Sequence, residues 1–273
     1  MLEFFKAVLF GIVEGITEWL PISSTGHMIL LNEFVQLDVS HEFWEMFLVV
    51  IQLGAILAVV LLFWKKIFPL EKKKTYRLNA DIMNMWYKVI IACIPAAVVG
   101  IFFDDILEQY LYNYFTVSLA LILFGVAFLI IEEKNKTVEP RIDAIKDITW
   151  KTAVIIGVFQ LIAAIFPGTS RSGATILGGL MIGVSRTVAA EFTFFLAIPV
   201  MLGASLLKVV KFGFQFTGKE LGLLFVGMTV AFLVSVFVIK FLMDYIKKHN
   251  FKIFGWYRII LGVLVLLYFG IIA

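Results

Sequence analysis

Two short polar segments interrupt an otherwise apolar sequence, and the first begins with a pair of acidic residues. Glu14 and Glu18 stand four positions apart, so a helix places both carboxylates on one face. Such a pair can hold a hard divalent cation, Mg²⁺ or Ca²⁺, through its oxygen atoms, or one carboxyl can stay protonated as a general acid. A helix end wetted by interfacial water is the alternative. Because ionisable residues at membrane depth usually mark function, we favour a cation or proton site.

A histidine closes the same segment. His27 follows the hydroxyl-rich run from Ser23 to Thr25, at the start of a short apolar stretch that ends near Leu31. A histidine in an apolar stretch is often only a hydrogen-bonded core residue. The neighbouring hydroxyls and carboxylates favour the other interpretation, in which the imidazole serves as a general acid or base.

The second polar segment carries the strongest signal in the chain. It reads Pro167-Gly-Thr-Ser-Arg-Ser-Gly-Ala-Thr175, so small and hydroxyl residues lead into a short helix with Arg171 at its beginning. Backbone N–H groups and the positive end of the helix dipole would converge there with a guanidinium whose planar fork matches phosphate oxygens. We predict a phosphate-binding site. The structural alternative is an ion pair between Arg171 and Glu14 or Glu18, and both arrangements can exist in one resting state.

The composition requires a membrane setting for these segments. Hydrophobic residues make up 62% of the 273 residues and charged residues only 16%, with a mean hydropathy of +1.00. Ordinary soluble domains are about half apolar and about one-quarter charged, so a soluble protein is excluded. A helix needs roughly 20 apolar residues to cross a ~30 Å hydrocarbon core. Continuous runs of this length favour helices over barrel strands and predict six spans, at approximately 43–64, 89–107, 112–131, 188–209, 220–243 and 253–273.

The two polar segments break shorter apolar runs, at residues 4–13 and 152–166. Broken helices at membrane depth are tolerated only where they are buried in protein or line a polar cavity, so both are predicted to be re-entrant hairpins. The predicted fold is an all-α polytopic membrane protein with an inverted repeat, each half being one re-entrant helical hairpin plus three transmembrane helices. The halves are residues 1–131 and 151–273 of a single membrane domain, joined by a charged connector, 132–150. An odd number of spans per half inverts the second half.

The distribution of basic residues supports this threading. Cytoplasmic loops carry an excess of Lys and Arg, and the threading places three basic clusters on one side. Both termini then face outward, and the two hairpins enter from opposite faces so that their tips meet near the midplane. The clusters are Lys65, Lys66, Lys72, Lys73, Lys74, Arg77 and Lys88; Lys134, Lys136, Arg141, Lys146 and Lys151; and Lys240, Lys247, Lys248, Lys252 and Arg258.

The two segments together resemble a known family. The stretch from Glu14 to His27, EGITEWLPISSTGH, and the stretch from Pro167 to Thr175, PGTSRSGAT, are similar to the signatures of the bacterial undecaprenyl-diphosphate phosphatases of the bacitracin-resistance type. The similarity spans essentially the whole chain. The family pattern often has an aromatic residue where Trp19 and Thr169 stand, and only Trp19 keeps it here.

The resemblance implies an activity and a set of site residues. It implies removal of one phosphate from undecaprenyl diphosphate, which recycles the lipid carrier of cell-wall synthesis on the outer face of the bacterial cytoplasmic membrane and confers bacitracin resistance. A divalent cation is associated with the activity. The implied partners are the prenyl diphosphate and membrane lipid, with no nucleic acid, and a homodimer is one option for the oligomeric state. Carried onto this chain, the implied site residues are Glu14, Glu18, Ser24, His27, Ser170, Arg171, Ser172 and Thr175, and we expect Gly168 to contribute to substrate binding beside them.

Two mechanisms and two functions stay open at this point. Ser24 activated by His27 would form a phosphoryl-enzyme, which we favour, whereas a water activated by His27 or a carboxylate would hydrolyse the substrate directly. A transporter that flips prenyl phosphates is the competing function, because inverted repeats with broken helices are typical of transporters. A carrier needs only the phosphate-binding half of the site, so the Ser24 and His27 pair favours the hydrolase.

Overall fold

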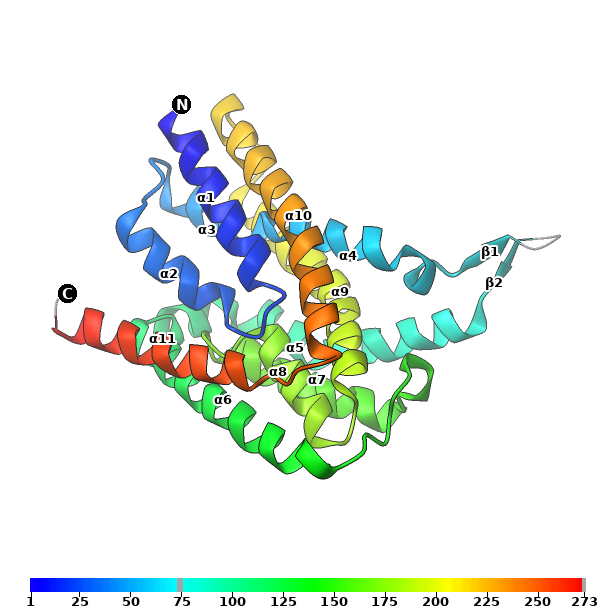
Figure 1. Cartoon of the computed structure of the whole chain (residues 1–273). Helices are drawn as coiled ribbons and strands as arrows, with labels where there is room; N and C mark the ends of the chain where they lie inside the picture. The colour runs from blue at the N-terminus through cyan, green and yellow to red at the C-terminus, as the bar shows by residue number, and fades with distance from the viewer. Residues whose placement is uncertain (73–75, 272–273) are drawn as a thin grey trace.

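Helices form most of the described chain, residues 1–72 and 76–271, in this computed structural model (Figure 1). The first half contains α1 (Leu2–Thr17), α2 (Ser24–Phe34), α3 (His41–Val50), α4 (Gln52–Ile67), α5 (Ala80–Leu111) and α6 (Tyr114–Lys134). The second half contains α7 (Trp150–Ile165), α8 (Arg171–Met181), α9 (Arg186–Phe212), α10 (Gly218–Ile246) and α11 (Lys252–Ile271). The connector holds two short 3₁₀ helices, η1 (Asn135–Thr137) and η2 (Ile145–Asp147).

Six helical segments are long and apolar enough to cross a membrane, as the sequence predicts. They are His41–Ile67, Ala80–Phe103, Tyr114–Thr137, Arg186–Phe212, Gly218–Ile246 and Lys252–Ile271. The first of them comprises α3 and α4, which meet at Ile51, a residue with helical backbone angles. The all-α class is confirmed, with one small addition. An antiparallel ribbon of β1 (Leu70–Lys72) and β2 (Tyr76–Leu78) projects from the bundle (Figure 1).

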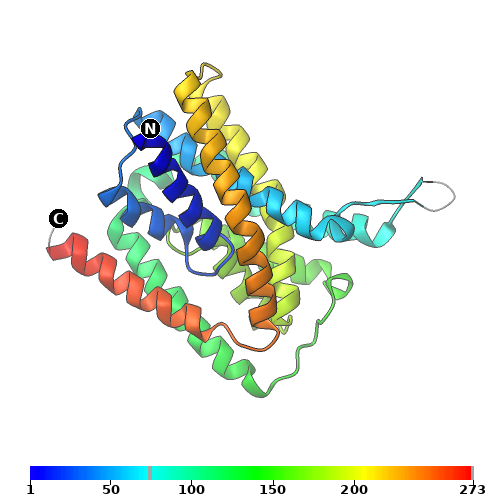
Figure 2. The ribbon, with the colours of Figure 1, turned by 45° about the horizontal axis from the view of Figure 1, so that its top comes forward.

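The order of elements repeats, and the two halves interleave. Helix α1 packs along α10 of the other half, α7 packs along α5, and α6 packs along α11 (Figures 1 and 2). Glycines permit the first two contacts. A Cβ on Gly11 of α1 would stand 2.7 Å from the carbonyl oxygen of Gly227, and a Cβ on Gly157 of α7 would stand 2.6 Å from that of Ala92. Small residues let helix backbones approach closely, as is common between membrane helices.

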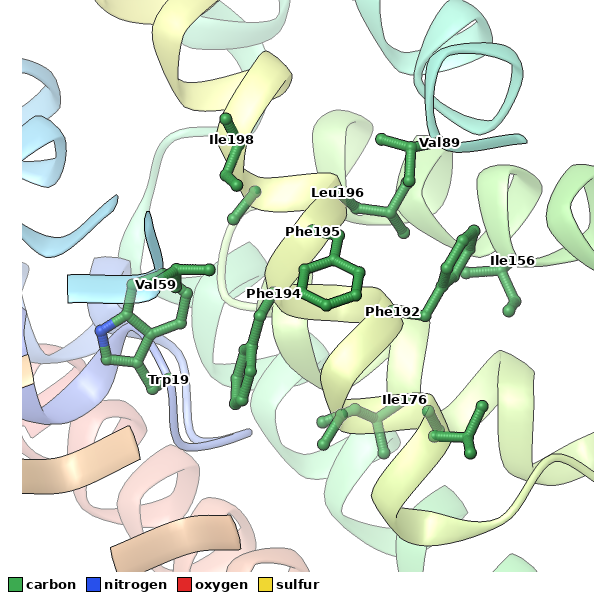
Figure 3. Close-up of a cluster of buried hydrophobic side chains, with 14 of the residues drawn as sticks. Trp19, Val59, Val89, Ile156, Ile176, Phe192, Phe194, Phe195, Leu196 and Ile198 are labelled. Atoms are coloured by element: carbon green, nitrogen blue, oxygen red, sulfur yellow. The ribbon is translucent and has the colours of Figure 1, made fainter. Parts of the chain in front are cut away.

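An aromatic core anchors the first hairpin. Trp19 directly follows Glu18 and is completely buried, with its ring edge-on to Phe194 of α9 at a centroid distance of 5.3 Å. Figure 3 shows Trp19 and Val59 together on one side of Phe194, with Phe195 next to Phe194 on α9. Aromatic pairs of this kind stabilise by about 0.5–1.5 kcal/mol beyond their buried area. The packing fixes the end of α1 against α9.

The structure corrects part of the predicted loop assignment. Arg258 was assigned to a basic cytoplasmic loop, but it lies within α11 and is completely buried. Lys88 likewise lies inside α5 and is buried. A charged side chain near a span end cannot be assigned to a loop or a helix by composition alone, because only tertiary contacts decide its depth. Lys73 and Lys74 of the first cluster fall outside the described residues.

Candidate active site

Both hairpins use the same unusual turn to start their second helix. Ser23 precedes α2 with φ +74°, and Ser170 precedes α8 with φ +69°. The two are the non-glycine residues with positive φ in the described part of the chain. The side chain of Ser23 accepts from Gly26 N, and that of Ser170 accepts from Gly173 N. Such backbone costs about 1–3 kcal/mol per residue and clusters at functional sites.

The first residues of α2 and α8 converge on one carboxylate. Ser24 Oγ donates to Glu18 Oε2 at 2.8 Å, and Arg171 Nη2 donates to Glu18 Oε1 at 3.0 Å. Glu18 is only 6% exposed, so this contact is nearly free of solvent screening. The ion pair foreseen between Arg171 and Glu18 is therefore present. The two predicted segments, more than a hundred residues apart in sequence, form a single site.

Both terminal nitrogens of Arg171 donate hydrogen bonds to protein groups, whereas its Nε–H has no partner among the residues that the structure describes. Its Nη1 donates to the carbonyl oxygen of Thr193 in α9 at 2.9 Å. Its Nε is buried with no hydrogen-bond partner in the described residues. An arginine presents five N–H donors in a fixed fork, and here the Nε–H donor is left without a partner in the described part of the chain.

Ser172 and Thr175 support the turn from behind. Ser172 Oγ makes contacts with the carbonyl oxygens of Glu18 at 3.0 Å and Leu20 at 3.3 Å, which tie the two hairpins together. Thr175 Oγ1 contacts the carbonyl oxygen of Arg171 at 2.9 Å and the hydroxyl of Thr193 at 2.8 Å. Both side chains are completely buried. Through these contacts, Ser172 and Thr175 hold Arg171 and the start of α8 in place.

Ser170 and Gly168 shape the second turn. Ser170 Oγ lies 3.1 Å from Ser172 Oγ, in addition to capping α8. Gly168 has φ +88°, and a Cβ there would stand 2.4 Å from the carbonyl oxygen of Val117 in α6. Only glycine fits this position, because both the backbone angle and the close approach exclude a side chain.

Glu14 lies one helical turn before Glu18 and is 1% exposed. Its Oε1 is buried without a hydrogen-bond partner in the described residues. No cluster of three or more His, Cys, Asp or Glu side chains suited to a metal occurs among the residues that the structure describes. The carboxylates at the site are therefore Glu14 and Glu18, the pair predicted from the sequence. One oxygen of this pair, Glu14 Oε1, has no hydrogen-bond partner in the described residues.

His27 makes different contacts from those expected. Its Nδ1 lies 2.7 Å from the carbonyl oxygen of Ser23, and its Nε2 lies 2.7 Å from the hydroxyl of Tyr257. The hydrogen bond of Ser24 goes to Glu18 instead. In this arrangement Glu18, not His27, is the base in direct contact with the Ser24 hydroxyl.

Sequence reasoning missed three residues at the site: Thr193, Tyr257 and Arg258. Thr193 gave no signal, since a threonine inside an apolar span is ordinary. Arg258 could have been found, because it lies within the predicted span 253–273, where an ionisable residue indicates function by default. Its guanidinium donates to carbonyl oxygens of both hairpin turns.

The fold and this site define a multi-pass membrane protein with an arginine, two carboxylates and a serine gathered where two short helices begin. The chain belongs to the family described as bacitracin resistance protein BacA, whose sequence profile matches residues 7–264. It is 65% identical over 270 residues to an undecaprenyl-diphosphatase of Desulfitobacterium hafniense, covering 99% of this chain and 97% of that relative. It is 64% identical to undecaprenyl-diphosphatase 1 of Clostridium acetobutylicum, covering 99% of each. An undecaprenyl-diphosphatase of Enterococcus faecalis is 59% identical, with 97% of both chains covered.

Proposed function

We propose that this protein hydrolyses undecaprenyl diphosphate to undecaprenyl phosphate and inorganic phosphate. The observation that carries the proposal is the convergence of Ser24 and Arg171 on Glu18 at the starts of two helices. The names of the relatives, which are 54–65% identical over nearly the full chain, support the same reaction. The product is the lipid carrier for cell-wall synthesis, and its recycling would confer bacitracin resistance.

Arg171 and the start of α8 bind the diphosphate in this proposal. The diphosphate is an anion, and moving it out of water is costly unless a positive charge compensates it. The guanidinium supplies that charge and bidentate N–H donors. The unpartnered Nε of Arg171 supports a ligand on that side of the guanidinium. In the transition state the same donors stabilise charge on the oxygens of the transferred phosphoryl group. The prenyl chain lies among the apolar spans.

Ser24 is the nucleophile in the mechanism that the geometry supports best. Its Oγ attacks the terminal phosphorus while its proton passes to Glu18, with which it is already hydrogen-bonded. The bond from that phosphorus to the bridging oxygen breaks, and undecaprenyl phosphate leaves. Water then hydrolyses the phosphoserine and releases inorganic phosphate. Direct attack by water remains the alternative, and His27 serves as general acid or base in either mechanism.

A divalent cation, Mg²⁺ or Ca²⁺, would be held by Glu14 and Glu18. The unpartnered oxygen of Glu14 fits a hard cation, and phosphate oxygens of the substrate would supply further ligands. When bound, the cation would neutralise charge on the diphosphate. A homodimer stays a prediction.

The membrane arrangement that we propose is the inverted repeat, with two re-entrant hairpins and a site open to the outer face of the cytoplasmic membrane. The repeated element order and the exchanged packing of α1 with α10 and α7 with α5 support it. Single cysteines introduced after replacing the chain's one native cysteine, Cys93, by alanine test it. Labels at Lys136 should react only from the cytoplasm and labels at Asp38 only from outside, since both side chains are exposed. Reaction of both from one face would contradict the threading.

The activity is tested with purified protein and labelled undecaprenyl diphosphate. We expect release of inorganic phosphate that falls on chelation and returns with Mg²⁺ or Ca²⁺. A transporter would instead move prenyl phosphate across vesicles without releasing phosphate. Transport with no phosphate release would overturn the hydrolase assignment.

A further inference from the structure

Arg258 of α11 is a buried cation that joins the two hairpin turns. Its Nη1 donates to the carbonyl oxygen of Pro21 in the first turn at 3.2 Å. Its Nη2 donates to the carbonyl oxygens of Gly168 at 3.1 Å and Thr169 at 2.6 Å in the second turn. Its Nε points to Leu121 O of α6 at 3.5 Å. One side chain thereby contacts the backbone of three separate segments.

This guanidinium is compensated by carbonyl dipoles. It is 0% exposed, and its hydrogen bonds in the described part of the chain all go to backbone carbonyl groups. Burying a charge is costly unless it is well hydrogen-bonded, and a fixed fork of five N–H donors meets that need better than the ammonium of lysine. An apolar residue at this position would avoid the cost of burying a charge, but it could not hydrogen-bond to both turns. These contacts are therefore what the arginine contributes.

The preceding residue, Tyr257, contacts His27. Because the carbonyl oxygen of Ser23 can only accept, Nδ1 of His27 carries the proton that it shares at 2.7 Å. In the neutral ring Nε2 is then an acceptor, and the Tyr257 hydroxyl donates to it at 2.7 Å. The two rings are nearly parallel, with planes 6° apart. Tyr257 is 44% exposed, so this contact lies at the open side of α11.

We propose that α11 supplies two positioning residues for the reaction: Arg258, which sets the spacing of the two turns, and Tyr257, which donates to Nε2 of His27 and fixes the orientation of its ring. The inference rests on the proposed function. Arg258 acts through the turns that begin α2 and α8, and hence through Ser24 and Arg171. Tyr257 acts through His27 alone. The two assignments rest on separate contacts and are tested separately.

For Arg258 the informative variant is Arg258→Lys, which keeps the charge and loses the fork. A misplacement of about 1 Å at a catalytic group can cost roughly a hundredfold in rate, so we expect kcat per folded molecule to fall about that much, with KM changed less than about threefold. Hydrogen exchange, followed by mass spectrometry, should increase in peptides covering both 18–26 and 165–175. The control is Arg186→Lys, because Arg186 pairs with Glu132 away from the site. It should lower Tm without changing kcat or the exchange of either turn.

A purely structural role for Arg258 would give a different result. In that case Arg258→Lys would lower Tm as the control does, while kcat and exchange in the turns stay unchanged, and the assignment would be wrong. If Arg258→Lys does not fold, Gly173→Ala replaces it, because the added Cβ would stand 2.6 Å from Arg258 Nη1 and displace the guanidinium. An increase in the exchange of both turns is expected there too, with a smaller fall in kcat of about tenfold.

For Tyr257 the experiment is ¹⁵N NMR of histidine-labelled protein. The chain has three histidines, so His41→Gln and His249→Gln leave His27 as the single signal. We expect a protonated Nδ1 and an unprotonated, hydrogen-bonded Nε2. Tyr257→Phe should move the Nε2 signal toward that of a free imidazole nitrogen and lower kcat about fivefold to tenfold, the worth of one hydrogen bond. Tyr268→Phe is the control, because that ring lies on the same helix against Phe34 and Phe269.

Two outcomes would overturn the Tyr257 assignment: a proton on Nε2 in the parent protein, or an Nε2 signal that Tyr257→Phe leaves unchanged. Hydrogen exchange and NMR need no turnover. If the parent protein releases no phosphate yet both readouts respond as expected, the contacts of α11 stand and the proposed reaction fails.

Discussion

The two hairpin turns have the same backbone conformation, but the side chains that follow them differ in chemistry: a hydroxyl in one and a guanidinium in the other. Each places a serine in a positive-φ conformation, and each caps the next helix at a glycine three residues later. The following residue differs, because α2 begins with Ser24 and α8 begins with Arg171, and both bind Glu18. The shared turn begins a helix whose first N–H groups have no partner within that helix. The first side chain then decides the role of each helix start: Ser24 is the proposed nucleophile, and Arg171 is proposed to bind the phosphate.

The two second helices also differ in burial. Every residue of α8 from Ser172 to Leu180 is buried, whereas in α2 only Gly26 and Met28 are. Close packing restricts motion, so α8 serves as a fixed platform for Arg171. Helix α2 is the more open one, and it carries the proposed nucleophile and His27. The division between a rigid binding element and an accessible reacting element can be tested.

The largest effect is expected at the start of α2. Ser24→Ala removes the proposed nucleophile and should lower turnover by about three decades or more while substrate binding persists, as for other covalent nucleophiles. Rapid quench of the parent protein should trap a phosphoryl group on Ser24. Ser40→Ala, which removes a capping hydroxyl of α3, is the control and should keep turnover. Substantial activity without a trapped intermediate would make water the nucleophile.

A smaller loss is expected at the start of α8. Arg171→Lys keeps the charge but not the bidentate fork, and lost transition-state contacts cost about 2–4 kcal/mol, roughly two to three decades in rate. Phosphate release by purified protein measures the loss. Near parental turnover would reduce Arg171 to the structural partner of Glu18 and end the distinction between the two helix starts.

Matching glycines should respond unequally. A Cβ on Gly173 would stand 2.6 Å from Arg258 Nη1, whereas a Cβ on Gly26 would stand 3.3 Å from the flexible end of Leu121. Overpacking at a well-packed position costs about 1–3 kcal/mol, so Gly173→Ala should lower turnover about tenfold and Gly26→Ala less than about threefold. Equal effects would show that the two turns are equally constrained.

The smallest effect is expected at the contact between Thr175 of α8 and Thr193 of α9. Thr175→Val leaves the hydroxyl of Thr193 without its partner at 2.8 Å and should destabilise the protein by about 1–3 kcal/mol, with little change in KM. The double variant with Thr193→Val should recover part of this loss, because both polar groups are then gone. Met28→Leu, at the matching position of α2, should change stability least. Tm measured in detergent gives the comparison, and additive losses would exclude the proposed coupling.

Local sequence patterns predicted much of this site. The spacing of Glu14 and Glu18 places them one helical turn apart, and the hydroxyl-rich segments begin short helices as expected. The partner of Ser24 was not predicted, because which base lies nearest depends on how two hairpins meet. Arg258 was misassigned for the same reason. Its acceptors belong to segments about 90 and 237 residues away in sequence.

The sequence by itself determined a helical membrane protein, its six spans, the two polar segments that interrupt its apolar runs and the residue types available for phosphate chemistry. It could do so because hydrophobic length and short-range spacing are local properties, and the hydrocarbon core selects directly on them. Only the tertiary structure decided that Glu18 is shared by Ser24 and Arg171, that His27 contacts Tyr257, and that Arg258 joins both turns. These pairings depend on the packing of helices distant in sequence, which no local pattern records.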